Sequence, residues 1–312
     1  MRTDTSKQWT SQKTGQDDYL YTWLDAFFLD RRAQNMTGGT LYFYEKKLEL
    51  FTRYCESQAV THITQIDANL LRGFLLWLET TGHNPGGCHA AYRAVKTFLR
   101  WWVDEVEPED WRNPTQRVKA PKVPTEPIEG ISLDDVKALL STCKRGQFTG
   151  ERDRAIILAL LDTGARAAEF CAVSLDDVNT TTGEILVRQG KGRKPRMVYI
   201  GKAARKQLRI YLKMRTDDSA ALWVTQDGER LTVWGLNSVM ARRAQLAGIA
   251  RPGLHDFRRA FALNMLRAGV DIFSLQRLMG HADVSILRRY LKQTDGDGRR
   301  AHELGSPVDK AL

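Results

Sequence analysis

A proline-punctuated basic segment between Arg112 and Glu129 divides the chain into two halves with different sequence patterns. Its prolines block regular helix, and its basic residues outnumber its acidic ones. A chain of 312 residues is also too long for one ordinary hydrophobic core. The segment therefore predicts two domains joined by a semi-rigid, positively charged linker at residues 112–130.

The N-terminal half carries apolar and aromatic residues at helical spacing. Tyr92, Phe98 and Trp102, for example, fall on one face of a single segment. Stripes with this spacing are more typical of a helical core than of platforms for stacking bases. We predict a compact domain of four or five helices at residues 17–111, preceded by a polar extension at residues 1–16.

The C-terminal half is predicted to be mixed. Short alternating runs at Gly183–Arg188 and Arg196–Ile200 flank a Gly- and Lys-rich turn and indicate a hairpin, to which Ala221–Val224 can add a third strand. Ser132 is expected to cap a helix that begins the domain. Further helices are expected at Arg152–Thr163, Ala203–Met214, Thr232–Ala247, His255–Ala268, Ile272–Met279 and Asp283–Leu291. The fold class is thus mainly α with a small β-sheet (α+β), with this domain at residues 131–295 and a tail at 296–312.

Composition limits the class of partner. A hydrophobic fraction of 42% is that of a globular protein, and the net charge of +10 favours a polyanion such as nucleic acid over a merely solvated basic surface. No secretory signal or membrane-length apolar run is present, so we expect a cytoplasmic protein without a membrane partner. The scattered cysteines predict neither disulfides nor a zinc site, and they are Cys55, Cys88, Cys143 and Cys171.

Arg166 follows a turn in which Gly164 is expected to end one helix before the chain enters another. Glu169 lies one helical turn further on, so its carboxylate can hold the guanidinium. A guanidinium presents a rigid fork that matches phosphate oxygens bidentately. We therefore expect Arg166 to face a phosphate, against the alternative of an ordinary surface ion pair.

His255 and Arg258 are three residues apart at the start of a helix opened by Pro252-Gly253. This spacing puts both side chains on one face near the positive end of the helix, where an imidazole and a guanidinium can hold a phosphate between them. Lys191 lies at the tip of the predicted hairpin, from which an ammonium can donate a proton to a leaving oxygen. Basic residues interpreted as contacts to a nucleic-acid backbone are Arg117, Lys119, Lys122, Arg193, Lys194 and Arg196.

His281 follows Gly280, which is expected to end a helix, and Tyr290 lies in a basic helical segment further on. Tyrosine can form a covalent intermediate, which splits strand cleavage and rejoining into two reversible steps. Alone, each of these residues is more often structural. The set of two guanidiniums, an ammonium, two imidazoles and a phenol indicates a site that grips a phosphodiester and attacks it.

The order and spacing of these segments resemble the signature boxes of the tyrosine recombinases, or phage integrases. The segments are Thr163-Gly164-Ala165-Arg166 with Glu169, Gly190-Lys191-Gly192, His255-Asp256-Phe257-Arg258, Leu278-Met279-Gly280-His281 and Arg289-Tyr290-Leu291. The resemblance implies that a helical, SAM-like core-binding domain precedes a tyrosine-recombinase catalytic domain. One departure is Arg259, where many members have a second histidine.

The resemblance also implies roles for these residues. Tyr290 would attack the scissile phosphate and form a 3′-phosphotyrosyl bond. Arg166 and Arg258 would stabilise the transition state, with His281 as a further donor and Glu169 as a support for the first arginine.

Proton transfers would fall to two further residues. Lys191 would protonate the departing 5′ oxygen, and His255 would assist proton transfer at the nucleophile. No metal or other cofactor is implied, because the phosphotyrosine conserves the bond energy. The implied partners are double-stranded DNA with paired recombination sites and further copies of the chain, assembled as a tetramer on that DNA.

Three alternatives stay open: a type IB topoisomerase-like enzyme, a catalytically silent integrase-like DNA-binding protein, and a helical adaptor for an acidic partner. The compact helical domain favours a recombinase over the first, and the complete set of site residues argues against the other two. The target DNA, the choice among integration, excision and resolution, and whether the tail docks on a neighbouring protomer or frays are left open.

Overall fold

The computed structural model describes residues 18–124, 129–188 and 195–280, together with residues 299, 302, 303, 306, 308 and 309. It divides the chain into two compact units, Met1–Thr125 and Glu126–Leu312. Their boundary falls inside the segment that the sequence predicts as a linker. We refer to them as the helical unit and the mixed unit.

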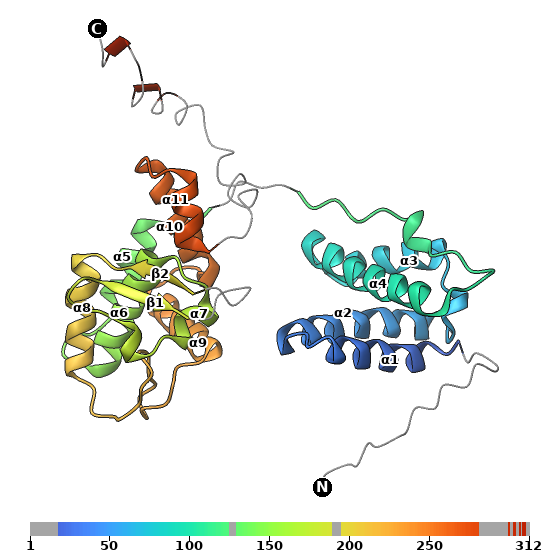
Figure 1. Ribbon diagram of the computed structural model, residues 1–312, viewed down its shortest axis with the longest axis horizontal. Coiled ribbons are helices and arrows are strands. Elements are labelled where there is room, and N and C mark those ends of the chain that lie inside the picture. Colours follow the sequence, from blue (N-terminus) through green and yellow to red (C-terminus); the bar gives the residue numbers. More distant parts are fainter. Residues whose placement is uncertain are drawn as a thin grey trace. The chain divides into compact units, whose positions relative to one another are not determined.

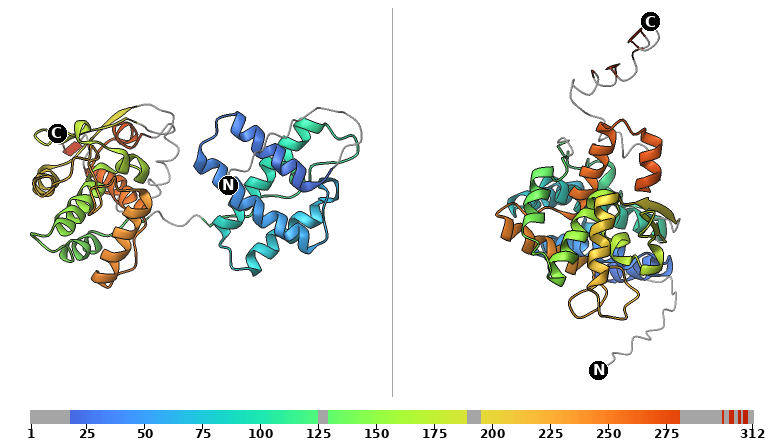
Figure 2. Two further views of the ribbon diagram at one scale, coloured as in Figure 1. Left: turned by 90° about the horizontal axis from the view of Figure 1, so that it is seen from below. Right: turned by 90° about the vertical axis from the view of Figure 1, so that its left-hand side faces the viewer.

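The helical unit contains α1 (Leu20–Ala33), α2 (Gly38–Ser57), α3 (Ala68–Thr80) and α4 (Pro85–Val106), with α4 packed against the other three (Figures 1 and 2). The aromatic stripe of α4 is buried, since Tyr92 is 3% exposed and Phe98 and Trp102 are 0% exposed. This confirms the interpretation of the stripe as core.

Helix starts in this unit follow from short polar side chains. Thr37 accepts from the Thr40 amide at 3.3 Å, Asp67 from the Leu70 amide at 2.7 Å, and Asn84 from the Gly87 amide at 2.7 Å. Each such cap satisfies one amide that would otherwise lack a partner in the first turn.

The helical unit extends beyond the boundary predicted at residue 111. Trp111 donates its indole N–H to the Ile66 carbonyl at 3.1 Å, and the Tyr92 hydroxyl donates to the Val118 carbonyl at 2.6 Å. A 3₁₀ turn, η2 (Pro114–Gln116), lies between them, and Val118 is 5% exposed. The first part of the predicted linker therefore packs on the helices because it has apolar surface to bury.

The mixed unit is built around α6 (Phe148–Thr163), which packs against α8 (Lys202–Lys213) and α10 (Leu254–Arg267) (Figure 1). Ser132 caps the first helix, as predicted, by accepting from the Asp135 amide at 2.9 Å. The other helical elements in the described part of this unit are α5 (Leu133–Ser141), α7 (Ala167–Ala172), the 3₁₀ turn η3 (Leu175–Asp177), α9 (Val233–Ala247) and α11 (Ile272–Met279). The predicted helix at Asp283–Leu291 lies outside the described residues.

The predicted hairpin is confirmed. Strands β1 (Glu184–Val187) and β2 (Arg196–Tyr199) pair antiparallel, with Glu184 opposite Tyr199 and Val187 opposite Arg196. The predicted third strand at Ala221–Val224 is wrong. That run makes only isolated bridges, Ser174 with Ala221 and Val224 with Arg230. The Leu222 amide donates to the Val173 carbonyl and the Trp223 carbonyl accepts from the Leu231 amide, so the backbone of the run bonds to loop segments and does not extend the sheet.

α10 and α11 share a small core of their own, formed by Phe261, Leu263, Leu275 and Met279 with Ala262. This core fixes the end of α11 against α10. No helix within the described ranges is long and apolar enough to cross a membrane.

All four cysteines are free and buried. Burial raises the pKa of Cys55 to about 12 and that of Cys171 to about 11, so both thiols stay protonated at neutral pH.

Candidate active site

Arg166 lies where α6 ends and α7 begins. Gly164 closes α6 in the left-handed conformation, with φ 56°, and a Cβ there would come within 2.3 Å of the Phe261 ring on α10. The Arg166 guanidinium donates through Nη1 to Glu169 Oε1 at 2.8 Å, and its backbone amide donates to Glu169 Oε2 at 3.1 Å. The predicted contact between this arginine and Glu169 is therefore present.

Arg258 lies in the first half of α10 and is 1% exposed. Its Nη1 donates to the Gly164 carbonyl at 2.6 Å and its Nη2 donates to the Met279 carbonyl at 2.6 Å. Both acceptors are at the C-terminal ends of helices, where backbone carbonyls lack intrahelical partners and carry partial negative charge. The positive end of α10 thus delivers a guanidinium to the negative ends of α6 and α11.

The end of α11 brings the two arginines together. Arg166 Nη2 donates to the Gly280 carbonyl at 3.0 Å, next along the chain from the Met279 carbonyl that binds Arg258. Gly280 ends α11 with φ 63°, as the sequence predicted. Three motifs far apart in the sequence therefore meet at one helix end.

His255 lies in the first turn of α10, one helical turn before Arg258. Burial lowers the pKa of His255 below its ordinary value of 6.5, and the positive charges of Arg259, Arg258 and Arg166 lower it further against an opposing effect of Asp256. Its imidazole is therefore neutral at physiological pH and able to accept a proton.

Glu169 is 4% exposed on its side chain and is ionised. Burial alone would raise the pKa of its carboxyl, but hydrogen bonds from Arg196, Arg166 and the Arg166 amide lower it below its ordinary value. Three guanidiniums and this one carboxylate leave the site with an excess of positive charge, which suits a phosphodiester.

Five predicted residues lie outside the described part of the chain, so their positions are not described. They are Lys191, Arg193, Lys194, His281 and Tyr290. Arg117, Lys119 and Lys122 are exposed, as contacts to a DNA backbone would need to be.

The sequence interpretation of Arg196 is wrong. Its side chain is 11% exposed and pairs with Glu169 at 2.6 Å, and its Nε donates to the Leu278 carbonyl at 2.9 Å. The Arg196 guanidinium therefore binds two groups of the protein itself and does not occupy the solvent-exposed position of a nonspecific backbone contact. Strand parity could have found it, because Arg196 lies two residues from the buried Val198 and so shares its inward face.

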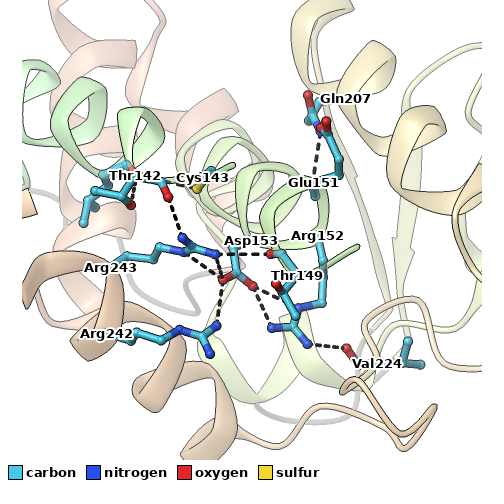
Figure 3. Close-up of polar contacts among 11 residues, drawn as sticks. Thr142, Cys143, Thr149, Glu151, Arg152, Asp153, Gln207, Val224, Arg242 and Arg243 are labelled. Atoms are coloured by element: carbon cyan, nitrogen blue, oxygen red, sulfur yellow. Dashed lines mark hydrogen bonds and ion pairs between the residues drawn. The ribbon is translucent and has the colours of Figure 1, made fainter. Parts of the chain in front are cut away.

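A second cluster of charges, which sequence reasoning missed, surrounds the fully buried Asp153 of α6 (Figure 3). Arg152 donates to Asp153 Oδ1 at 2.9 and 2.7 Å, Arg243 to Oδ2 at 2.8 and 2.7 Å, and Arg242 to Oδ2 at 3.0 Å. Arg152 and Arg243 also donate to carbonyls of Val224 and Thr142, at 3.1 and 2.7 Å. The cluster ties α6 to α9.

Within the described ranges, no group of three or more His, Cys, Asp or Glu side chains could hold a metal ion.

Residues 130–296 match the Phage integrase family. The chain is 32% identical over 250 residues to the tyrosine recombinase XerA of Thermococcus kodakarensis, which covers 79% of this chain and 85% of that protein. The Tn1549 transposon integrase in complex with a circular intermediate DNA is similar in structure, with a TM-score of 0.76 at 17% identity over 92% of this chain and 99% of that chain. A lambda integrase tetramer bound to a Holliday junction gives a TM-score of 0.71 at 16% identity, over 85% of this chain and 78% of that chain.

The mixed unit, with its two-stranded sheet and the arginine pair at the ends of α6 and α11, thus has the fold of a tyrosine recombinase catalytic domain. The chain belongs to the phage integrase family, and it is a site-specific DNA recombinase of the tyrosine type.

Proposed function

We propose that this recombinase cuts and rejoins DNA strands through a 3′-phosphotyrosyl bond, with Tyr290 as the nucleophile. The observation that carries the proposal is the arginine pair, Arg166 and Arg258, held on the adjacent carbonyls of Gly280 and Met279 at 3.0 and 2.6 Å. Guanidiniums that are already fixed need little reorganisation as charge develops on the phosphate.

In the proposed cleavage step the Tyr290 oxygen bonds to phosphorus while the bond from phosphorus to the 5′ oxygen breaks. The phenol proton passes to His255, whose lowered pKa keeps it neutral and able to accept it. Lys191 gives a proton to the departing 5′ oxygen, and His281 donates to a nonbridging oxygen. Attack by a 5′ hydroxyl on the phosphotyrosine reverses the step and joins the strands, with no cofactor consumed.

The proposed partner is double-stranded DNA carrying paired sites, on which four copies assemble to integrate, excise or resolve a DNA segment. The similar lambda integrase, a tetramer on a Holliday junction, supports this proposal. The net charge of +10 suits a polyanionic partner, and so do the exposed Arg117, Lys119 and Lys122. Arg193 and Lys194 are proposed as further backbone contacts, and residues 296–312 as a contact to a neighbouring protomer.

The decisive experiment compares Tyr290→Phe with a matched control. The substrate is a nicked suicide duplex carrying the sequence that the native protein selects from a random DNA library. The native protein should form a covalent adduct at a 3′ phosphate in the presence of a chelator, and Tyr290→Phe should bind the duplex without forming it. Tyr199→Phe, which removes the hydroxyl of a half-exposed tyrosine on β2, should form the adduct normally.

If Tyr290→Phe forms as much adduct as the native protein, the nucleophile is a residue other than Tyr290. Relaxation of supercoiled DNA lacking any paired site, without strand exchange, would instead indicate topoisomerase-like activity.

A further inference from the structure

Three consecutive backbone carbonyls end α11, and each accepts a hydrogen bond from a different arginine. The Leu278 carbonyl accepts from Arg196 at 2.9 Å, the next carbonyl, of Met279, accepts from Arg258 at 2.6 Å, and the Gly280 carbonyl accepts from Arg166 at 3.0 Å. The arginines come from β2, α10 and the start of α7. The last carbonyls of a helix need partners from outside, and cations are favoured there.

Arg196 has a second partner that joins it to Arg166. Glu169 accepts from Arg166 on Oε1 at 2.8 Å and from Arg196 on Oε2 at 2.6 Å. The two guanidiniums therefore share one carboxylate, with one oxygen each. Arg166, Glu169, Arg196 and the backbone from Leu278 to Gly280 form a closed ring of contacts.

Gly280 leaves room for this ring. A Cβ at Gly280 would come within 2.9 Å of both Cζ and Nε of Arg196 and within 3.0 Å of its Cδ. These distances are too short for carbon contacts, so the Arg196 side chain occupies the space that a Cβ at residue 280 would need. The positive φ of 63° favours glycine at the same position.

We propose that Arg196 is a positioning residue for strand cleavage, which holds Arg166 and the end of α11 in the geometry that the reaction needs. Arg196 acts on Arg166 through Glu169, and on the Gly280 carbonyl through its hold on Leu278. This inference rests on the proposed function, because it concerns the step in which Arg166 stabilises the phosphate.

A lysine cannot replace Arg196 in this role. The Arg196 guanidinium presents Nη2 to Glu169 and Nε to Leu278 from one rigid plane. An ammonium is a single point on a flexible chain and cannot hold both acceptors in that geometry. Arg196→Lys therefore keeps the charge and opens the ring.

The test compares Arg196→Lys and Arg196→Gln with Arg188→Lys in the full-length protein. Arg188, which directly follows β1, pairs with Asp177 of η3, so the control changes another guanidinium–carboxylate pair of the same unit. Cleavage is measured as single-turnover adduct formation at saturating concentrations of the selected suicide duplex, and affinity for the uncleaved duplex is measured separately. We expect Arg196→Lys to lower the cleavage rate about 10-fold or more, the scale of losing a residue that orients a reacting group, with little change in affinity.

A second measurement does not depend on the reaction. Side-chain N–H NMR signals of Arg166 in the unbound protein should shift and broaden in Arg196→Lys and in Arg196→Gln, but not in Arg188→Lys. Native cleavage rates in both Arg196 variants, or a rate loss matched by an equal loss of affinity, would overturn the proposal. If the native protein forms no adduct at all, the proposed function fails, while unchanged Arg166 signals in the Arg196 variants would by themselves exclude the ring.

Discussion

The two units differ in where they keep their charges. Among the described residues of the helical unit, the buried polar side chains are Thr52 and Thr115, and none is charged. The mixed unit buries Glu151, Arg152, Asp153, Glu169, Asp177, Arg243 and Arg258. The first unit is held by aromatic and aliphatic packing, whereas the second must also neutralise ions inside its core.

We infer from this difference that the buried ions of the mixed unit fix the positions of side chains more than they add to stability. A buried ion pair is often no more stable than an apolar replacement of the same volume, but removing one partner is costly. The described residues of the helical unit include no buried charged side chain whose partner could be removed in this way. Hydrogen exchange of peptides reports the stability of each unit within the full chain, so it can tell a lost buried counter-charge from a lost apolar contact.

The largest effect is expected at Asp153. Asp153→Asn keeps the shape of the side chain but leaves the guanidiniums of Arg152 and Arg243 buried without their counter-charge. The mixed unit should lose about 3–5 kcal/mol of its free energy of unfolding. Asp134→Asn, which breaks an exposed pair with Lys137 in the same unit, should change nothing measurable. If peptides of the mixed unit are equally protected from exchange in the two variants, the buried charges of this unit do not set it apart from the helical unit.

In the helical unit, the most damaging kind of substitution should be one that leaves a cavity in the apolar core. Leu99 is 0% exposed, and Leu99→Ala should lower the free energy of unfolding of this unit by about 2–5 kcal/mol. Peptides of the mixed unit should keep their native exchange rates, because each unit has its own core. Faster exchange in both units would show that they unfold together.

A smaller effect should test whether Trp111–Ala120 belongs to the helical unit. Tyr92→Phe removes the hydroxyl that donates to the Val118 carbonyl at 2.6 Å, and this should cost about 1 kcal/mol. In this variant, the increase in exchange rate over the native protein should be larger for peptides covering Val118 than for peptides of α2. If the peptides covering Val118 exchange as fast in the native protein as in the variant, the segment is a free tether.

The smallest effect concerns acid. Hydrogen bonds lower the folded-state pKa of Glu169 despite its burial, so the unfolded state takes up the proton first as the pH falls. Its contribution to stability is complete above the ordinary value of 4.5 and is lost as the pH falls through the folded value. The mixed unit should therefore lose protection before the helical unit as the pH falls below about 4.5, and not between neutral pH and that value. Glu169→Gln should make the protection of the mixed unit depend less steeply on pH. An unchanged dependence on pH would contradict the lowered pKa of Glu169.

Local spacing predicted much of the fold and part of the site. The contact between Arg166 and Glu169 spans one helical turn, so sequence alone implied it. The hairpin and the glycine ends of α6 and α11 also follow from residues close in sequence. The roles of Lys191, His281 and Tyr290 stay predictions.

Long-range contacts could not be predicted in the same way. Arg196 binds Leu278, and Asp153 binds Arg243, although each pair is far apart in the sequence. The periodic spacing of residues along a helix or strand gives no information about contacts at such separations. The run Ala221–Val224 failed for a related reason, since a short apolar run fits a buried loop as well as a strand. Basic residues in particular look alike in sequence whether they face solvent or a buried carboxylate.

The end of α11 recognises its arginines through peptide oxygens and not through side chains. Substitutions at Leu278 or Met279 alter packing but leave those oxygens in place, whereas inserting one residue within α11 would turn its end by about 100° and shift it by about 1.5 Å. Such a helix tolerates substitutions but not insertions or deletions. In relatives of this chain, the count of residues before the closing glycine should therefore vary less than their identity.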